Sequence, residues 1–217
     1  MVANDLAALL FLTSLGCIDH NPWSSRVDDL EHPDYFFFDL DPSDETDFAV
    51  VVTIAKALDK KLQEIGVTPF LKTSGATGFH LYIPVEPVYT YAQLRTFAEV
   101  VARMVSAEHP NLVTHERMVA KRPKGRVLID VHQNATGKPL AAPYVARAFP
   151  RAPVSAPVSV RELTPNLTPE RFNIKTMPTR IAEKGDLWAD FWTRRLKIED
   201  VMERLGASVA GRKAGGS

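Results

Sequence analysis

Two aspartates end a short apolar segment near the start of the chain. The segment reads YFFFDLD, and its carboxylates, Asp39 and Asp41, are followed at once by Pro42. In a strand, side chains two residues apart leave the same face, and their Cα atoms lie about 6.5–7 Å apart. Two negative charges on one face repel each other unless a cation lies between them. The spacing therefore fits one hard divalent cation or a pair of them.

A third carboxylate follows another apolar segment, RVLID, which ends at Asp130. Mg²⁺ and Mn²⁺ prefer oxygen ligands, and two such ions about 3.5–4 Å apart are the usual device for phosphoryl transfer. Asp39, Asp41 and Asp130 are therefore the candidate catalytic and metal-binding residues, with two Mn²⁺ or Mg²⁺ ions as cofactors. His132 shares the face of Asp130 if the strand continues that far.

Other interpretations of the D-x-D pattern stay open at this point. Such a pair is common by chance, and a strand end with solvated acidic side chains accounts for it as well. Haloacid-dehalogenase phosphatases also carry D-x-D after an apolar strand, although Thr or Val usually follows where Pro42 stands here. Sugar-nucleotide transferases carry D-x-D too, but they do not account for the glycine turn described next.

A glycine-rich turn lies between two further strand-like segments, in the stretch KTSGATGFH. Glycines permit tight backbone geometry with exposed N–H groups, which suits an anion, and a serine hydroxyl or an imidazole adds further donors. The candidate nucleotide-binding residues of this stretch are Lys72, Ser74, Gly75, Thr77 and His80. A hairpin turn with glycines for shape alone is the alternative.

Acidic and basic residues are concentrated in different parts of the chain. Residues 1–50 hold eleven Asp and Glu against Arg26 alone, whereas residues 110–151 hold eight Lys and Arg against two acidic residues, and the formal net charge is zero. This split fits an anion held between carboxylates and basic side chains; two solvated faces of opposite sign are the alternative. A planar guanidinium in the proline-rich stretch, that of Arg147, suits a triphosphate. The basic loop before the third aspartate supplies the candidate DNA-binding residues Lys121, Arg122, Lys124 and Arg126.

Length and composition suit one good-sized domain or two small ones; we expect a single domain over residues 1–206 and a flexible tail over residues 207–217. The chain has 217 residues, 45% of them hydrophobic, which is enough to fold around a core without cross-links. Cys17 is the single cysteine, so no internal disulfide can form and a reducing cytoplasm is expected. No apolar run approaches membrane-spanning length, and the first residues lack the basic start of a signal peptide.

Strands and helices alternate along the sequence. Strands are expected over residues 35–41, 68–73, 79–85 and 126–132, and the proline-rich segment 138–157 is expected to run extended over the surface. This pattern predicts an α/β or α+β fold with helices packed on one sheet.

Helix boundaries are signalled by caps. A short first helix is expected between Asn4 and Gly16, and a second, over residues 45–66, is expected to be capped near Asp44. A third, over residues 90–109, has Thr90 and Gln93 spaced as a capping box. Two closing helices are expected over residues 186–195 and 197–206.

These motifs, in this order, resemble the polymerase (primase-polymerase) domain of bacterial ligase D, within the archaeo-eukaryotic primase superfamily. The segments that carry the resemblance are NPWSSRVDD, FFFDLDP, KTSGATGFHLYIPV, LIDVHQNATGKPLAAPYVARAFPRAPVSAPV and TMPTRIAEKGDLWADFW, which lie between Asn21 and Trp192. The first reads HPWSSRVDD in the family. The resemblance implies a primase-like catalytic core with an RRM-like antiparallel or mixed sheet.

The resemblance implies a nucleotidyltransferase that adds ribo- or deoxyribonucleotides to a DNA 3′-hydroxyl during gap filling and end extension in non-homologous end-joining repair. It implies two divalent ions, often Mn²⁺, on the three aspartates, and triphosphate contacts from Ser74, His80 and Arg147. Gln133 and Asn134 match the family's QN pair. The implied partners are gapped or broken DNA ends, a nucleoside triphosphate, a DNA ligase and an end-binding protein, at the nucleoid of a bacterial or archaeal cell.

Two features depart from the family pattern. Many relatives carry lysine at the position of Thr77, so one phosphate contact is missing or supplied elsewhere. Relatives also carry a longer region ahead of the tryptophan motif, which contacts template DNA and its 5′-phosphate, whereas Trp23 lies near the start of this chain. We therefore expect an N-terminally shortened domain with a complete catalytic core. A nucleic-acid-binding fragment with weak or no catalysis, and a metal-dependent phosphatase, are the alternatives.

Overall fold

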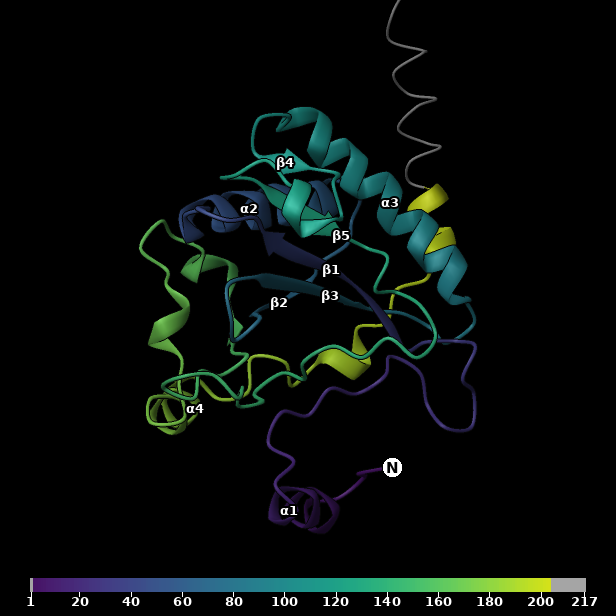
Figure 1. Cartoon of the computed structure of the whole chain (residues 1–217). Coiled ribbons are helices and arrows are strands. Elements are labelled where there is room, and N and C mark those ends of the chain that lie inside the picture. Colours follow the sequence, from purple (N-terminus) through teal and green to yellow (C-terminus); the bar gives the residue numbers. More distant parts are fainter. Residues whose placement is uncertain (1, 204–217) are drawn as a thin grey trace, which may run out of the picture.

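A six-stranded sheet with strand order β4-β5-β1-β3-β2-β6 forms the centre of the molecule (Figure 1). The structure is a computed structural model that describes residues 2–203. The strands are β1 (Tyr35–Pro42), β2 (Phe70–Thr73), β3 (Phe79–Pro84), β4 (Val113–Thr114), β5 (Val127–Asp130) and β6 (Pro157–Val158). All neighbouring pairs are antiparallel except β4 and β5, which are parallel. The predicted mixed sheet is confirmed.

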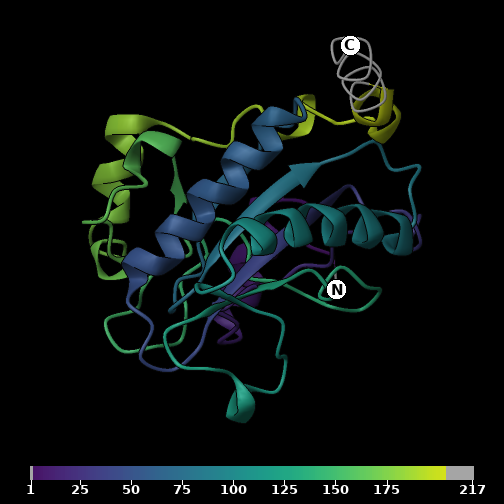
Figure 2. The ribbon, with the colours of Figure 1, turned by 90° about the horizontal axis from the view of Figure 1, so that it is seen from above.

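Two of the α-helices, α2 (Phe48–Glu64) and α3 (Tyr91–Glu108), cover one face of this sheet. The α-helices α1 (Leu6–Ser14) and α4 (Met177–Lys184) precede and follow them in the chain. Phe36, Phe38 and Leu40 alternate along β1 and are fully buried in the main core with the apolar sides of α2 and α3. Figures 1 and 2 show both helices lying across the same side of the sheet. Burial of these large side chains fixes which face of β1 turns inward.

The opposite face of the sheet is divided between an aromatic half and a polar half. Tyr35 and Phe37 stand on it with Tyr82, and the rings of Trp188 and Phe191 cover them. The next two positions of β1 on this face are the two aspartates. The aromatic half is therefore sealed from solvent, while the polar half is left for the site described below.

The caps of the first three helices test the sequence expectations. Thr90 and Gln93 form the predicted capping box of α3. The first helix is capped by Asp5 and not by Asn4, because the Asp5 carboxylate accepts a hydrogen bond from the Ala8 N–H at 2.7 Å. The second helix begins after Asp47, whose carboxylate caps Ala49 N–H, so the predicted start near residue 44 is three residues early.

The segment predicted as a helix over residues 186–195 is instead a series of turns with one 3-10 turn, Phe191–Thr193. The rings of Trp188 and Phe191 stack on each other, with centroids 5.2 Å apart, and pack on the sheet. This burial overrides the local helical pattern. Residues 198–203 are helical, and the rest of that predicted helix and the predicted tail lie outside the described residues.

Two other expectations need correction. Strand β5 ends at Asp130, because its carboxylate accepts the backbone N–H of His132 at 2.8 Å and turns the chain; His132 therefore does not continue the strand face. The segment 138–157 has no helix but is not wholly on the surface, since Ser155 and Ala156 are fully buried. No helix within residues 2–203 is long and apolar enough to cross a membrane.

Candidate active site

A row of polar side chains crosses four strands on the open half of the sheet. Asp39 on β1 lies directly opposite Asp130 on β5 and directly opposite His80 on β3. His80 in turn lies opposite Lys72 on β2. Opposite residues of antiparallel strands project from the same face, with Cβ atoms about 4.5–5.5 Å apart. Asp41 joins the row from two residues further along β1.

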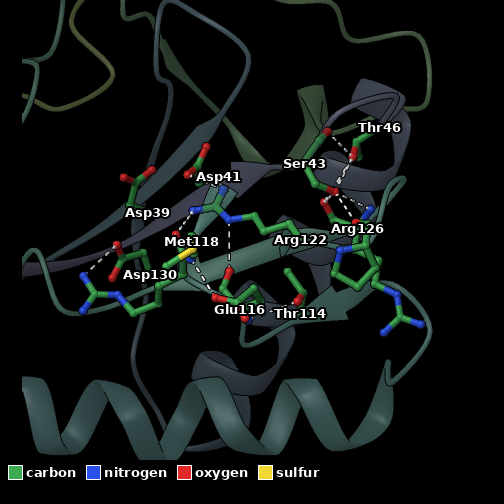
Figure 3. Close-up of polar contacts among 12 residues, drawn as sticks. Asp39, Asp41, Ser43, Thr46, Thr114, Glu116, Met118, Arg122, Arg126 and Asp130 are labelled. Atoms are coloured by element: carbon green, nitrogen blue, oxygen red, sulfur yellow. Dashed lines mark hydrogen bonds and ion pairs between the residues drawn. The ribbon is translucent and has the colours of Figure 1, made fainter. Parts of the chain in front are cut away.

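Each candidate carboxylate lies beside a basic or imidazole group. Oδ1 of Asp39 is 3.3 Å from Nε2 of His80. Oδ2 of Asp41 accepts a hydrogen bond from Nη1 of Arg122 at 2.7 Å (Figure 3). Asp130 lies 3.9 Å from a nitrogen of Arg117. The two guanidinium groups balance part of the negative charge that β1 and β5 bring together.

The donor chemistry of the three aspartates fits a hard divalent cation. They are oxygen ligands on one face of neighbouring strands, which is what Mg²⁺ and Mn²⁺ prefer. As the side chains stand, no three His, Cys, Asp or Glu groups within residues 2–203 are gathered closely enough to hold a metal ion. Side-chain rotation, with release of Asp41 from Arg122, would be needed to bring the carboxylates together.

The glycine turn joins β2 to β3, and its backbone is held by Ser74. Oγ of Ser74 accepts hydrogen bonds from the N–H groups of Ala76 at 3.1 Å and Gly78 at 2.9 Å. These two N–H groups therefore serve the turn, and the hydroxyl hydrogen is what Ser74 can offer a ligand. A side chain at Gly78 would meet the Leu40 carbonyl oxygen at 2.5 Å, so glycine is needed there.

Arg147 lies against the turn. Its Nη1 donates to the Ser74 carbonyl at 2.6 Å, and its Nε donates to Asp19 at 2.8 Å. Gly75 has φ +74°, and a Cβ on it would lie 2.6 Å from Cγ of Arg147. Arg147, the arginine predicted to contact the triphosphate, thus packs against the turn and stabilises it. Asp19, its ion-pair partner, was not singled out from the sequence, because the two residues lie 128 positions apart.

A pocket of about 300 Å³ opens beside this turn. The predicted residues that line it are Asp39, Asp41, Ser74, Thr77, His80 and Arg147. Asn21 and the segment 139–141 line it as well, and sequence reasoning gave neither a role. The asparagine in place of histidine at the start of NPWSSRVDD was the one available signal for Asn21.

His80 and Lys72 lie deeper than the pocket surface. His80 is 3% exposed, and burial together with the charge of Lys72 lowers its pKa to about 4, so its imidazole is neutral. Lys72 is fully buried, and its Nζ lies 2.7 Å from Nδ1 of His80. Lys72, a predicted nucleotide-binding residue, thus lies behind the histidine and is not among the residues that line the pocket.

The four predicted DNA-binding residues have different surroundings. The side chain of Arg122 is 5% exposed and, besides Asp41, bonds the carbonyls of Glu116 and Arg117. Lys124 pairs with Glu45, and Arg126 donates to the Pro110 carbonyl. Lys121 is exposed. Arg122 thus ties the basic loop to β1, which differs from the flexible stretch expected from the sequence.

Asn134, whose role the sequence left open, hydrogen-bonds the backbone of β1. Its amide accepts from Phe37 N–H at 2.9 Å and donates to Phe37 C=O at 2.8 Å. It thereby satisfies the backbone of β1 at a point beyond the end of β5. The following residues leave the sheet toward the segment 139–141 that lines the pocket.

The chain belongs to the family of LigD primase-polymerase domains, whose model matches residues 1–188. It is 32% identical over 194 residues to the bifunctional non-homologous end joining protein LigD of Bacillus subtilis, covering 88% of this chain and 31% of that protein. It is 30% identical to the multifunctional LigD of Pseudomonas aeruginosa, covering 91% of this chain and 24% of that protein. The chain thus spans less than a third of the length of these relatives.

A solved structure shares the fold. The polymerase domain from Mycobacterium tuberculosis ligase D, in complex with DNA, matches with a TM-score of 0.78 and 27% sequence identity. The match covers 90% of this chain and 70% of that domain. The predicted family and fold class are confirmed.

Proposed function

We propose that this chain is a nucleotidyltransferase that adds ribo- or deoxyribonucleotides to a DNA 3′-hydroxyl, for gap filling or end extension in non-homologous end joining. The observation that carries the proposal is the row formed by Asp130, Asp39 and His80 on three neighbouring strands beside the pocket. Membership of the LigD primase-polymerase family and the related domain in complex with DNA support it.

The proposed roles follow from the donors present. Asp39, Asp41 and Asp130 would hold two Mn²⁺ or Mg²⁺ ions, which when bound neutralise the charge of the triphosphate and activate the 3′-hydroxyl. Ser74 would donate its hydroxyl hydrogen to a phosphate oxygen. Arg147 uses Nε and Nη1 within the protein, so Nη2 is the nitrogen it would offer a phosphate. The contribution of these residues is positioning and charge stabilisation.

The proposed partners are gapped or broken DNA, a nucleoside triphosphate, a DNA ligase and an end-binding protein. Lys121 has an exposed side chain on the loop between β4 and β5, close in sequence to the candidate metal site. A basic side chain there suits a phosphate of the DNA backbone.

Primer extension on gapped DNA with Mn²⁺ or Mg²⁺ tests this function. We expect extension by the wild type and loss of at least about a hundredfold in rate in the Asp39→Ala, Asp41→Ala double variant, because metal-binding carboxylates contribute several kcal/mol. Asp44→Ala, which removes an exposed carboxylate just beyond β1, is the matched control and should retain wild-type activity. Full activity in the double variant would contradict the proposal.

A second candidate is a nucleic-acid-binding domain with weak or no catalysis. The pairing of Arg122 with Asp41 favours it, since a guanidinium on a candidate ligand opposes a cation at the same oxygens. Gel-shift measurements on gapped DNA with and without a 5′-phosphate separate the two. Binding without nucleotide incorporation in either metal would favour the second function, and release of inorganic phosphate from a simple ester would indicate a phosphatase.

A further inference from the structure

The loop between β4 and β5 carries an exposed apolar tip among basic residues. Met118 and Val119 are neighbours at a short 3-10 turn and are 56% and 60% exposed. Figure 2 shows this turn, drawn in teal, standing out from the rest of the molecule. Arg117 and Lys121 flank the tip and are exposed as well. Single exposed apolar side chains are ordinary on a protein surface, so the position of this pair decides whether it has a function.

Hydrogen bonds hold the tip in one place. The Glu116 carboxylate accepts the Met118 N–H at 2.8 Å. Arg122 donates from Nε to the Glu116 carbonyl at 3.0 Å and from Nη2 to the Arg117 carbonyl at 3.2 Å. The loop is therefore preorganised, which lowers the conformational entropy lost when a ligand contacts the tip.

The same loop borders the candidate metal site on the β5 side. The Arg122 guanidinium that bonds the Arg117 carbonyl also donates to Asp41 at 2.7 Å. Nη2 of Arg117 lies 3.9 Å from Oδ2 of Asp130. Met118 follows directly in the chain, and Figure 3 shows it with Arg122 and the three aspartates. The apolar tip thus begins one residue away from groups that contact two of the candidate carboxylates.

The pocket proposed for the nucleotide lies on the other side of these aspartates. Its lining comes from β1, β3, the turn between β2 and β3, Asn21 and parts of residues 139–147. Within residues 2–203, none of the loop residues 115–126 lines it. Strand β5 neighbours β1 on the side away from β3. A nucleotide in the pocket and the tip of the loop therefore approach the aspartates from opposite sides.

The proposed reaction needs the primer 3′-hydroxyl at the aspartates while the triphosphate occupies the pocket. The strand that ends in this hydroxyl must then approach from the β5 side, where the loop lies. Its last nucleotide offers an apolar face of base and sugar together with phosphate charge. Methionine is polarisable and adapts to irregular surfaces, and apolar side chains contact bases at other nucleic-acid interfaces. Basic side chains suit the phosphates.

We propose that Met118 and Val119 are primer-binding residues that pack against the 3′-terminal nucleoside, while Lys121 contacts a phosphate of the same strand. The inference deepens the proposed function and rests on it for the identity of the ligand. A second copy of the chain is a less favourable occupant, because two basic loops would repel each other. An acidic protein surface would suit the charges but would not account for the place of the tip beside the aspartates.

Photocrosslinking locates the contact without relying on catalysis. The probe is gapped DNA whose primer ends in 5-iodouracil, irradiated with the wild-type protein in the absence of nucleotide. We expect the crosslinked peptide, identified by mass spectrometry, to contain Met118 or Val119. These crosslinks should disappear when the 5-iodouracil is moved into the middle of the primer duplex.

Primer-extension kinetics give the second readout. In the double variant Met118→Ser, Val119→Ser we expect KM for gapped DNA to rise about tenfold, through loss of apolar contact area, while kcat and KM for ATP change by less than about threefold. Met118→Leu, Val119→Ile keeps the apolar surface and should keep the wild-type KM for DNA. Val100→Ser, Met104→Ser is the matched control, since it changes an exposed valine and methionine of α3, which covers the opposite face of the sheet.

Salt dependence separates the apolar part of the contact from the charged part. Lys121→Gln should reduce the slope of log affinity for gapped DNA against log salt concentration by about one. The Met118→Ser, Val119→Ser variant should lower the affinity and leave this slope unchanged, because it removes no charge.

Two results would overturn the inference. One is binding of gapped DNA whose crosslinks from the primer terminus fall on other residues. The other is a KM for DNA in the Met118→Ser, Val119→Ser variant that is no higher than in the α3 control; the crosslink decides if this variant does not fold. A wild type that crosslinks at the tip but adds no nucleotide would refute the proposed function and leave the primer contact standing. A wild type that adds nucleotides without this crosslink would refute the contact alone.

Discussion

Arg122 and Asp41 are joined by a 2.7 Å hydrogen bond that connects the loop between β4 and β5 to the central strand. The guanidinium is also fixed by two carbonyl oxygens of its own loop. A charged hydrogen bond of this kind is worth about 1.5–3 kcal/mol. The pair thus stabilises the loop beside the candidate metal site.

Replacing this arginine should destabilise the fold. We expect Arg122→Met to lower the free energy of unfolding by about 2 kcal/mol, measured by urea denaturation. Lys124→Met is the matched control, because the Lys124–Glu45 pair is exposed and should contribute less than about 0.5 kcal/mol. Equal losses in the free energy of unfolding would show that the Arg122–Asp41 contact stabilises the fold no more than an exposed ion pair does.

The glycine turn offers a test of close packing. Gly75→Ala places a Cβ 2.6 Å from Arg147 at φ +74°, whereas Gly125→Ala has nearly the same φ, +71°, and no atom within 4 Å. The left-handed backbone costs about 1–2 kcal/mol at either position. We expect Gly75→Ala to cost at least about 1 kcal/mol more than Gly125→Ala in unfolding and to raise KM for nucleotide. Equal losses would mean that Arg147 moves aside freely.

The wild-type Asp19 carboxylate pairs with the Arg147 guanidinium, which we propose contacts the triphosphate. Because the carboxylate competes with phosphate for this guanidinium, its removal should strengthen nucleotide binding. In Asp19→Asn we expect the dissociation constant for ATP to fall about threefold to tenfold, since an amide competes less well than a carboxylate for Arg147. Asp28→Asn, an exposed aspartate of the same N-terminal region, is the control. Weaker ATP binding in Asp19→Asn would show that Asp19 positions Arg147 for the substrate.

Glu162 gives the fold a defined acid sensitivity. Burial alone would raise its pKa, but hydrogen bonds from Arg180 and Lys184 of α4 hold the pKa well below its ordinary value. The unfolded chain therefore binds this proton at a higher pH than the folded protein. The stabilisation is complete above about pH 4.5 and is lost as pH falls further.

The measurement is the free energy of unfolding as a function of pH. Glu162→Gln should cost about 1–3 kcal/mol at pH 7 and should flatten the decline in stability below about pH 4.5. Glu170→Gln changes an exposed glutamate and should leave the profile as in the wild type. An unchanged acid limb in Glu162→Gln would contradict this account.

Local patterns in the sequence determined several features by themselves. The apolar run that ends in Asp39 and Asp41 predicted a strand with both carboxylates on one face, and Thr90 with Gln93 predicted the capping box of α3; both are confirmed. The ordered motifs predicted the family and the fold class, which are also confirmed. These features depend on strand period, helix caps and residue order, which are properties of neighbouring residues.

Only the tertiary structure decided which side chains meet. The row that includes Asp130, Asp39 and His80 depends on strand register, and that register is set by burial of the apolar face of every strand together. The same holds for Arg122 on Asp41, for Asp19 on Arg147 and for the turns around Trp188. Such contacts join residues far apart in the chain, so their energies are absent from any local pattern, and the same packing places the buried Lys72 beside His80.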